Sequence, residues 1–311
     1  MQFEENKVKL NGFKNYYCDA LYCALGEFIN PSSYQLNSLS DEDLKTICEY
    51  SVVKNIMAGV RELNLKVPKY GFGRDALEKY GLYGKEIIDA ELIGLIPTSA
   101  LVGEKLAIEL SNLSEFTPQF LSETSEFVAL SDCEIIIELG QDLEEVGKLV
   151  NKYNCSPVEM LESFGFLDRK CFVYGLNFID KDDQKLLKDY NVTCIFFPVS
   201  DGENGFGAIN LYNFIYHQLK FGFSSGKCYN IDMLKEAKLA KLNTANLMND
   251  SGLIDLNDLL EPLEAKIGET ITLDECERKE NVLNKRVFIM HKDYQKLREE
   301  VKKIAKELKE I

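Results

Sequence analysis

Histidine is the side chain most often used to bind catalytic metals and to transfer protons near neutral pH, and this chain of 311 residues contains only two. They are His217 and His291, far apart in the sequence. A metal centre built from several histidines is therefore excluded, and so is a mechanism that needs several imidazoles. His217 falls within a predicted helix and His291 opens another near the C-terminus, so we expect a helical structural role for the first and a solvated position for the second.

The nine cysteines are an odd number and form no C-x-x-C pair. Several lie within apolar runs, such as Cys171 in CFVYG and Cys194 in TCIFF. Their spacing offers no cluster of thiolates for a zinc site. The first residues, MQFEENKVKL, lack the basic start and apolar run of a signal peptide. We therefore expect reduced, mostly buried thiols in a cytoplasmic protein.

Acidic residues outnumber basic ones by 51 to 36, which gives a formal net charge of −15. Such a surface repels phosphate backbones, so we expect no nucleic-acid partner. No run reaches the roughly 18 apolar residues that span a bilayer, so we expect no membrane association. A glycine pair, Gly71 and Gly73, lacks the third glycine of a dinucleotide-binding motif, and we expect a loop there.

Eight apolar, β-rich runs alternate with helical patterns along the chain. Continuous apolar runs are typical of strands that are covered on both faces. Strand–helix alternation indicates parallel pairing with right-handed crossovers, and eight such units predict a closed (β/α)₈ TIM barrel of the α/β class. An open, doubly wound sheet is the alternative. The predicted strands are 12–18, 59–67, 87–95, 105–110, 134–139, 171–176, 192–198 and 219–224.

Helix starts support this division of the chain. Ser156-Pro157-Val158-Glu159 combines an N-cap serine, a proline at the first helical position and a glutamate at the third. Ser40 with Asp43, and Asp180 with Asp183, give two further starts of this kind.

The C-terminal residues have a separate pattern. Apolar side chains recur at alternating steps of three and four from Tyr294 to Ile311, with charged residues between them. This spacing predicts an amphipathic helix of three heptads. The helix either docks on its own barrel or makes a contact between helices in an oligomer.

The segment from Asp132 to Leu247 resembles the amidohydrolase superfamily, in the branch of guanine, cytosine and S-adenosylhomocysteine deaminases and triazine chlorohydrolases. PVEMLE matches that family's P-V-E-x-L-E helix, and GFGA at Gly205–Ala208 matches its G-x-G-x-A loop. FPVSD at Phe197–Asp201 falls where the family has N-P-x-S-N. The resemblance is weaker from Asn11 to Leu130. It implies a (β/α)₈ barrel, in agreement with the independent count of strands.

The resemblance also implies a divalent metal at the C-terminal ends of the strands. Typical members bind it with H-x-H on strand one, histidines on strands five and six, and aspartate on strand eight. A metal-bound hydroxide attacks the substrate, because the ligands lower the pKa of the bound water to about 7. A glutamate three residues after the strand-five histidine moves protons.

Each of these positions carries a different residue in this chain. Tyr17 and Asp19 match the H-x-H pair, Glu138 the strand-five histidine and Gln141 the glutamate. Tyr174 and Asn177 match two strand-six histidines, Phe196 the strand-seven histidine and Ser225 the metal-binding aspartate. Neutral tyrosine is a poor zinc ligand, phenylalanine has no lone pair to offer, and glutamine cannot accept and return a proton near neutral pH. We therefore expect no metal and no other cofactor.

The family usually adds a small β-sandwich made from both chain ends, and only about ten residues precede the first strand here. We expect a degenerate barrel over residues 1–260, with the sandwich largely missing. Residues 261–311 would form a tail with one hairpin-like remnant of the sandwich and the amphipathic helix.

The leading functional hypothesis is a pseudoenzyme: an amidohydrolase-like protein that has lost metal-dependent hydrolysis and acts as a binding or partner protein. Its expected partners are a small-molecule ligand in the barrel mouth, a second copy of the chain, or an active amidohydrolase relative. One alternative is an enzyme that uses the Asp19 and Glu138 carboxylates in the same pocket, beside Tyr17 and Tyr174. Another is a purely structural or assembly role that depends on the tail helix.

Overall fold

The structure is a computed structural model of the 311-residue chain. It describes residues 3–4, 7–8, 12–33, 38–97, 105–255, 257–259, 261–263, 265, 271–272, 276–281 and 286–310. In these residues no helix is both long enough and apolar enough to span a membrane.

Eight parallel strands form one sheet in the order β10-β9-β8-β7-β6-β5-β4-β3. The sheet curls into a nearly closed barrel: beyond β10, Gly226 accepts a hydrogen bond from the N–H of Asp19 at 3.1 Å and donates one to the carbonyl of Tyr17 at 3.1 Å. The predicted barrel is thus confirmed and the open sheet is wrong. The strands are β3 (Phe13–Asp19), β4 (Val60–Lys66), β5 (Tyr83–Asp89), β6 (Leu106–Leu110), β7 (Glu134–Leu139), β8 (Cys171–Gly175), β9 (Thr193–Phe196) and β10 (Lys220–Phe223).

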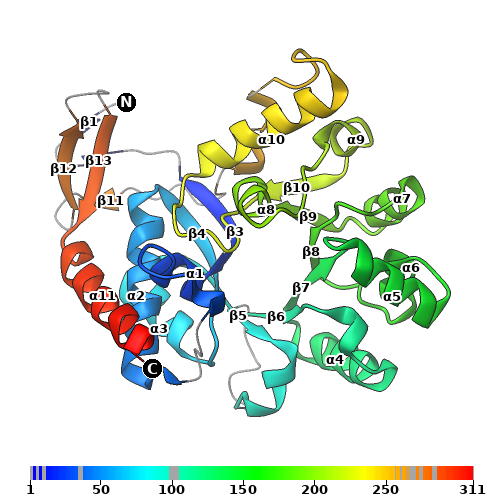
Figure 1. The fold of residues 1–311 in the computed structure, drawn as a ribbon, viewed down its shortest axis with the longest axis horizontal. Helices are drawn as coiled ribbons and strands as arrows, with labels where there is room; N and C mark the ends of the chain where they lie inside the picture. The colour runs from blue at the N-terminus through cyan, green and yellow to red at the C-terminus, as the bar shows by residue number, and fades with distance from the viewer. Residues whose placement is uncertain are drawn as a thin grey trace.

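The helices lie outside the strands (Figure 1). Capping boxes form at all three predicted sites, which are Ser40 with Asp43, Ser156 with Glu159, and Asp180 with Asp183. The helices are α1 (Ala20–Leu25), α2 (Asp41–Met57), α3 (Phe72–Lys79), α4 (Pro118–Ser131), α5 (Leu143–Tyr153), α6 (Pro157–Ser163), α7 (Lys181–Asp189), α8 (Pro198–Asn204), α9 (Leu211–Tyr216) and α10 (Met233–Met248).

Two local predictions were wrong. The third strand begins four residues earlier than expected and ends at Asp89, and the 3₁₀ helix η3 (Ala90–Leu95) follows it. Its first four residues, YGKE, lie at the N-terminal end of the strand, outside the apolar core of the barrel. They therefore lacked the apolar signal of a strand. The predicted loop at the glycine pair ends at Gly71, which lies in a turn and is the N-cap of α3, with a φ of 103° that favours glycine. Gly73 lies within the helix.

Side chains that point into the barrel form layers, because alternate residues of a strand face the same side. A buried apolar cluster fills the interior between the two ends of the barrel. Its members are Tyr17, Ile87, Ala107, Ile136, Phe172, Tyr174, Ile195 and Phe197. The interior is therefore packed and is not a pore, so ligand chemistry is confined to the two ends.

Segments from both parts of the chain, β1 (Phe3–Glu4) near the N-terminus and β12 (Cys276–Asn281), β13 (Arg286–His291) and the tail helix near the C-terminus, lie on the same side of the barrel (Figure 1). Strands β1, β2 (Lys7–Val8) and β11 (Ile271–Thr272) form a small antiparallel sheet. Strands β12 and β13 pair with each other in an antiparallel arrangement.

The tail helix α11 (Tyr294–Glu310) packs on α2 of its own chain, as one of the two alternatives predicted. Val301 is fully buried, the Tyr294 ring lies 5.5 Å from that of Tyr50, and Arg298 forms an ion pair with Glu27 at 2.5 Å. His291 precedes this helix, but it is only 4% exposed and its ring meets that of Tyr80 edge-on. The expectation of a solvated His291 was wrong.

Candidate functional site

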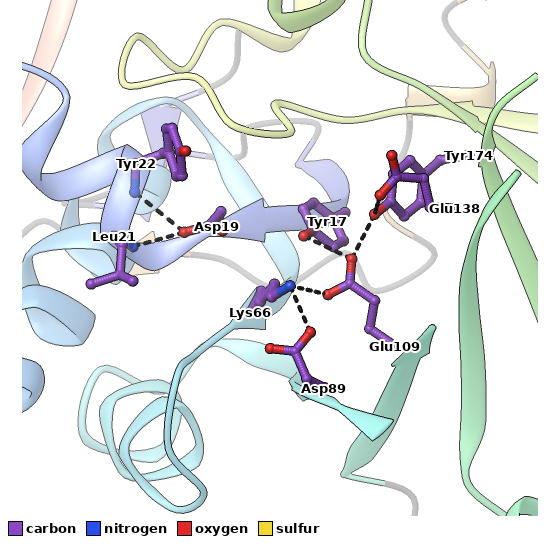
Figure 2. A network of polar contacts seen from close by, with 9 residues as sticks. All are labelled: Tyr17, Asp19, Leu21, Tyr22, Lys66, Asp89, Glu109, Glu138 and Tyr174. Atoms are coloured by element: carbon purple, nitrogen blue, oxygen red, sulfur yellow. Dashed lines mark hydrogen bonds and ion pairs between the residues drawn. The ribbon is translucent and has the colours of Figure 1, made fainter. Parts of the chain in front are cut away.

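Six inward-facing side chains meet at the C-terminal ends of the barrel strands, where active sites of such barrels lie. Figure 2 shows them as one connected network of hydrogen bonds and ion pairs. Each comes from a different neighbouring strand, from β3 to β8. They are Tyr17, Lys66, Asp89, Glu109, Glu138 and Tyr174.

Glu109 is the centre of this network and is only 1% exposed. Its Oε1 accepts hydrogen bonds from the Tyr17 hydroxyl at 3.0 Å and from the Tyr174 hydroxyl at 2.6 Å. Its Oε2 lies 2.5 Å from Nζ of Lys66. A buried carboxylate is costly unless it is paired and hydrogen-bonded, and these three contacts meet that requirement.

Lys66 is held between two carboxylates, because Oδ1 of Asp89 also lies 2.9 Å from its ammonium group. Burial by itself would lower the pKa of Lys66, but Glu109 and Asp89 outweigh it, and the pKa is raised well above its ordinary value. The ammonium group is thus positively charged throughout the physiological range of pH.

Tyr174 touches a second carboxylate, since its hydroxyl oxygen also lies 3.1 Å from Oε2 of Glu138. A hydroxyl has one proton, and the shorter contact to Glu109 uses it. Burial raises the pKa of Glu138, the nearby charge of Glu109 raises it further, and Lys227 opposes both. A protonated Glu138 can donate its own proton to the Tyr174 oxygen, which satisfies both contacts.

Aromatic rings fill the space beside these polar groups. The rings of Tyr17, Tyr174 and Phe197 lie 5.0 to 5.4 Å from one another, centroid to centroid. Burial and the charge of Glu109 raise the pKa of both tyrosines well above 10. Their hydroxyls are therefore neutral hydrogen-bond donors.

Asp19 lies at the edge of the network and caps a helix. Its Oδ1 accepts hydrogen bonds from the N–H groups of Leu21 at 3.0 Å and Tyr22 at 3.2 Å, at the start of α1 (Figure 2). Burial raises the pKa of Asp19, although Lys66 opposes this rise. The contacts of Asp19 are those of an N-cap residue.

The other four positions that match the family's site lie outside the network. Gln141 donates to Oδ1 of Asp201 at 3.0 Å, and Asn177 donates to the carbonyl of Phe206 at 2.8 Å. Phe196 faces outward, and its ring packs edge-on against a phenylalanine of α9, at 5.0 Å. Ser225 accepts a hydrogen bond from an asparagine of β3 at 2.9 Å, in the seam that closes the barrel.

Sequence reasoning missed Lys66, Asp89, Glu109 and Phe197. The first three share a signal, which is a charged side chain at an inward position near the end of an otherwise apolar strand. That signal was overlooked because the metal ligands of the related family come from other strands. Phe197 was missed because its neighbour Phe196 matches the family's histidine.

The donors at the mouth do not fit the family's metal. The two tyrosines are neutral and already engaged with Glu109, and Asp19 is engaged by α1. Across the ranges described above, no three residues among His, Cys, Asp and Glu are grouped so that they could bind a metal ion.

Comparison with known proteins finds relatives of part of the sequence and neighbours of most of the fold. No family model matches the chain. The chain is 25% identical over 127 residues to a 5-methylthioadenosine/S-adenosylhomocysteine deaminase from Caldicellulosiruptor saccharolyticus. These residues are 40% of this chain and 30% of that protein. A protein of the same description from Thermococcus onnurineus is 29% identical over 111 residues, 35% of this chain and 26% of that one. The matched segment thus spans less than a third of each of these relatives.

Solved structures share the fold over most of the chain. An amidohydrolase from Brucella melitensis superposes with a TM-score of 0.73 at 13% identity, over 96% of this chain and 89% of that one. An adenosine deaminase from Xanthomonas campestris with bound zinc superposes with a TM-score of 0.70 at 12% identity, over 86% of this chain and 73% of that one. The chain therefore has a (β/α)₈ barrel like those of the amidohydrolase and deaminase structures, and part of its sequence is similar to 5-methylthioadenosine/S-adenosylhomocysteine deaminases.

Proposed function

We propose that this protein is an amidohydrolase-like pseudoenzyme, which has lost metal-dependent hydrolysis and acts as a binding or partner protein. The observation that carries the proposal is the buried contact between Lys66 and Glu109 at the barrel mouth. A divalent metal supplies positive charge at this end of the related barrels. Here a lysine of the chain itself supplies one positive charge, and the surrounding hydroxyls and carboxylates are oriented toward that pair or toward each other.

This arrangement opposes the family's reaction in two ways. A fixed ammonium group repels a divalent cation placed near it, and the effect is strong where water is excluded. The residue in the place of the proton-transferring glutamate is Gln141, which donates its amide N–H to Asp201. General acid–base catalysis contributes roughly 10²- to 10⁴-fold to a rate, and an amide cannot supply it.

A cavity of about 450 Å³ lies beside the mouth. It is lined by Tyr22 of α1, the turn after α1, the end of α8, Lys227 and Tyr229. Its volume falls in the ordinary range of small-molecule sites. The charge of Lys227 also acts on the mouth, since it opposes the rise in pKa that burial causes at Asp19 and Glu138. We propose this cavity as the place of a small ligand, and a second copy of the chain or an active amidohydrolase as its protein partner.

The alternative function is an enzyme that uses Asp19 and Glu138 as acid and base. Glu138 has a pKa raised by burial, as an acid catalyst needs. Asp19, however, is occupied by two backbone N–H groups of α1. This difference favours a binding protein over an enzyme.

An ammonia-release assay tests the proposal. The purified chain is incubated with S-adenosylhomocysteine, 5-methylthioadenosine or 5′-deoxyadenosine, with and without added zinc, beside an active deaminase as a positive control. We expect no release above background from the wild type, Glu138→Gln or Asp19→Asn. Zinc-dependent turnover that Glu138→Gln abolishes would refute the pseudoenzyme, and metal-independent turnover lost in both variants would favour the alternative enzyme.

A further inference from the structure

The end of the barrel opposite the mouth contains a second cavity, of about 830 Å³. It is lined by residues at the N-terminal ends of the strands and by part of α3. Five of the eight strands bring a lysine to this end, either within the strand or just before it. They are Lys14, Lys85, Lys105, Lys170 and Lys220.

The charge of this lining is opposite to that of the whole chain. Its basic residues are the five lysines and Arg74, and its acidic residues are Glu62, Glu78, Glu86 and Glu134. Six cations thus face four carboxylates here, whereas the chain as a whole has 36 basic and 51 acidic residues. A concave, low-dielectric surface concentrates such a field and attracts anions.

Ion pairs hold three of these lysines in place. Lys14 lies 2.5 Å from Glu62, while Lys85 and Lys170 approach the same oxygen of Glu134, at 3.4 and 2.5 Å. The side chain of Glu134 is only 5% exposed, and that of Lys170 is 69% exposed. One buried carboxylate therefore positions two lysines, of which one lies within the cavity and the other at its rim.

The floor of the cavity is aromatic. Tyr16 and Phe172 both line it, with their ring centroids 6.0 Å apart and their planes inclined by 49°. The ammonium group of Lys14 lies 4.4 Å from the centroid of the Tyr16 ring. Gly222 of β10 makes room for this ring, since a Cβ at that position would lie 2.3 Å from a carbon of Tyr16. A ligand ring has an apolar surface to pack against here.

We propose that this cavity, at the N-terminal ends of the barrel strands, is a second ligand site, which binds a small organic anion. A ring of the ligand packs against Tyr16 and Phe172, and its phosphate or carboxylate group lies among the lysines. The chemistry is that of charge-assisted hydrogen bonds to an anion. The site is separated from the mouth by the packed interior of the barrel, so it goes beyond the function proposed above and does not depend on it.

Titration of the full chain with three probes tests this inference: phenyl phosphate, inorganic phosphate, and benzyl alcohol as the uncharged ring. Binding is followed by ligand-observed NMR at low and high salt. We expect saturable binding of phenyl phosphate, tighter than that of either other probe and weaker as salt is added. No saturable binding, or binding that is independent of salt, would overturn the inference.

Charge reversal locates the site. Lys170→Glu/Lys220→Glu changes two exposed residues of the rim, and Lys181→Glu/Lys188→Glu makes the same change of charge on exposed positions of α7. We expect the first pair to weaken phenyl phosphate about tenfold or more, which corresponds to about 1.4 kcal/mol, and the second less than about twofold. The single variant Lys170→Glu should lie between the wild type and the first pair. Equal weakening by both pairs would show a nonspecific effect of net charge and would overturn the site. Loss of binding in the mouth variant Glu138→Gln would also overturn it.

Discussion

Nζ of Lys66 lies 2.5 Å from Oε2 of Glu109, although β5 separates the two strands that carry these residues. The pair therefore bridges across the mouth of the barrel. The hydroxyls of Tyr17 and Tyr174 both donate hydrogen bonds to the same buried carboxylate of Glu109. The buried Glu109 carboxylate is thus paired within the barrel, at the end where the resemblance to amidohydrolases implies a metal.

Lys66→Met removes the cation and leaves Glu109 buried without a charged partner. Breaking a buried pair in this way costs about 3–5 kcal/mol, and urea unfolding should show a loss of that size. The double variant Lys66→Met/Glu109→Gln should recover most of it. Lys69→Met, which removes an exposed pair with Asp41, is the matched control and should cost less than about 1 kcal/mol. A Lys66→Met chain as stable as the control would contradict the role assigned to the pair.

Asp19 acts through α1, so its variants should differ in stability rather than in chemistry. Asn also accepts hydrogen bonds at an N-cap, and Asp19→Asn should unfold close to the wild type. Asp19→Ala loses both contacts and should cost about 1 kcal/mol, as measured by thermal or urea unfolding. Equal stability of the Ala and Asn variants would show that the cap is unimportant.

Two buried carboxylates, Asp201 of α8 and Glu236 of α10, make stability depend on pH. Burial raises the pKa of Glu236 to about 8 and that of Asp201 to about 7. The folded chain therefore binds these protons more tightly than the unfolded chain does. The stability that results is fully present below about pH 4, and is lost as the pH rises through 7 to 8.

Glu236→Gln keeps an acceptor for the N–H of Val199 and removes this titration. We expect it to be more stable than the wild type at pH 9, by an amount on the order of 3 kcal/mol, and to match it more closely at pH 5. Glu126→Gln, at an exposed position of α4, should leave the pH profile of unfolding unchanged. If the stability of the wild type and of Glu236→Gln changed with pH in the same way, the raised pKa of Glu236 would be contradicted.

The tail helix stabilises its own barrel, so its two faces should respond differently to the same substitution. Val301→Asp buries a charge against α2 and should cost at least about 3 kcal/mol. Lys302→Asp changes the next, exposed residue and should cost less than about 1 kcal/mol. Removing residues 293–311 should lower the melting temperature without changing the number of chains per particle. A fall in that number on removal would assign the helix to an oligomer interface instead.

The architecture could be predicted from the sequence because each signal was local. Apolar runs marked the central parts of the strands. Pairs such as Ser156 with Glu159 marked the helix starts, because their contacts lie within one turn. The strand that was misplaced, β5, begins with Tyr83, Gly84 and Lys85. These residues line the cavity at the N-terminal ends of the strands and so lack the continuous apolar run of a core strand.

The site could be predicted only in part, because its contacts join strands that are distant in sequence. Tyr17, Glu138 and Tyr174 were selected by resemblance, and the structure brings these three together. Their common partner is Glu109, and nothing in its neighbourhood along the chain indicates that two tyrosines and a lysine converge on it. The direction in which a side chain points decides such cases, as Phe196 and Phe197 show.

Metal content measures the central claim most directly. The chain is expressed with zinc, manganese and iron in the medium, purified without chelators and analysed for metal per chain. Its melting temperature is then recorded with and without added zinc. We predict far less than one metal per chain and no shift on adding zinc. One tightly bound metal per chain, lost in Glu138→Gln or Tyr174→Phe, would contradict the account.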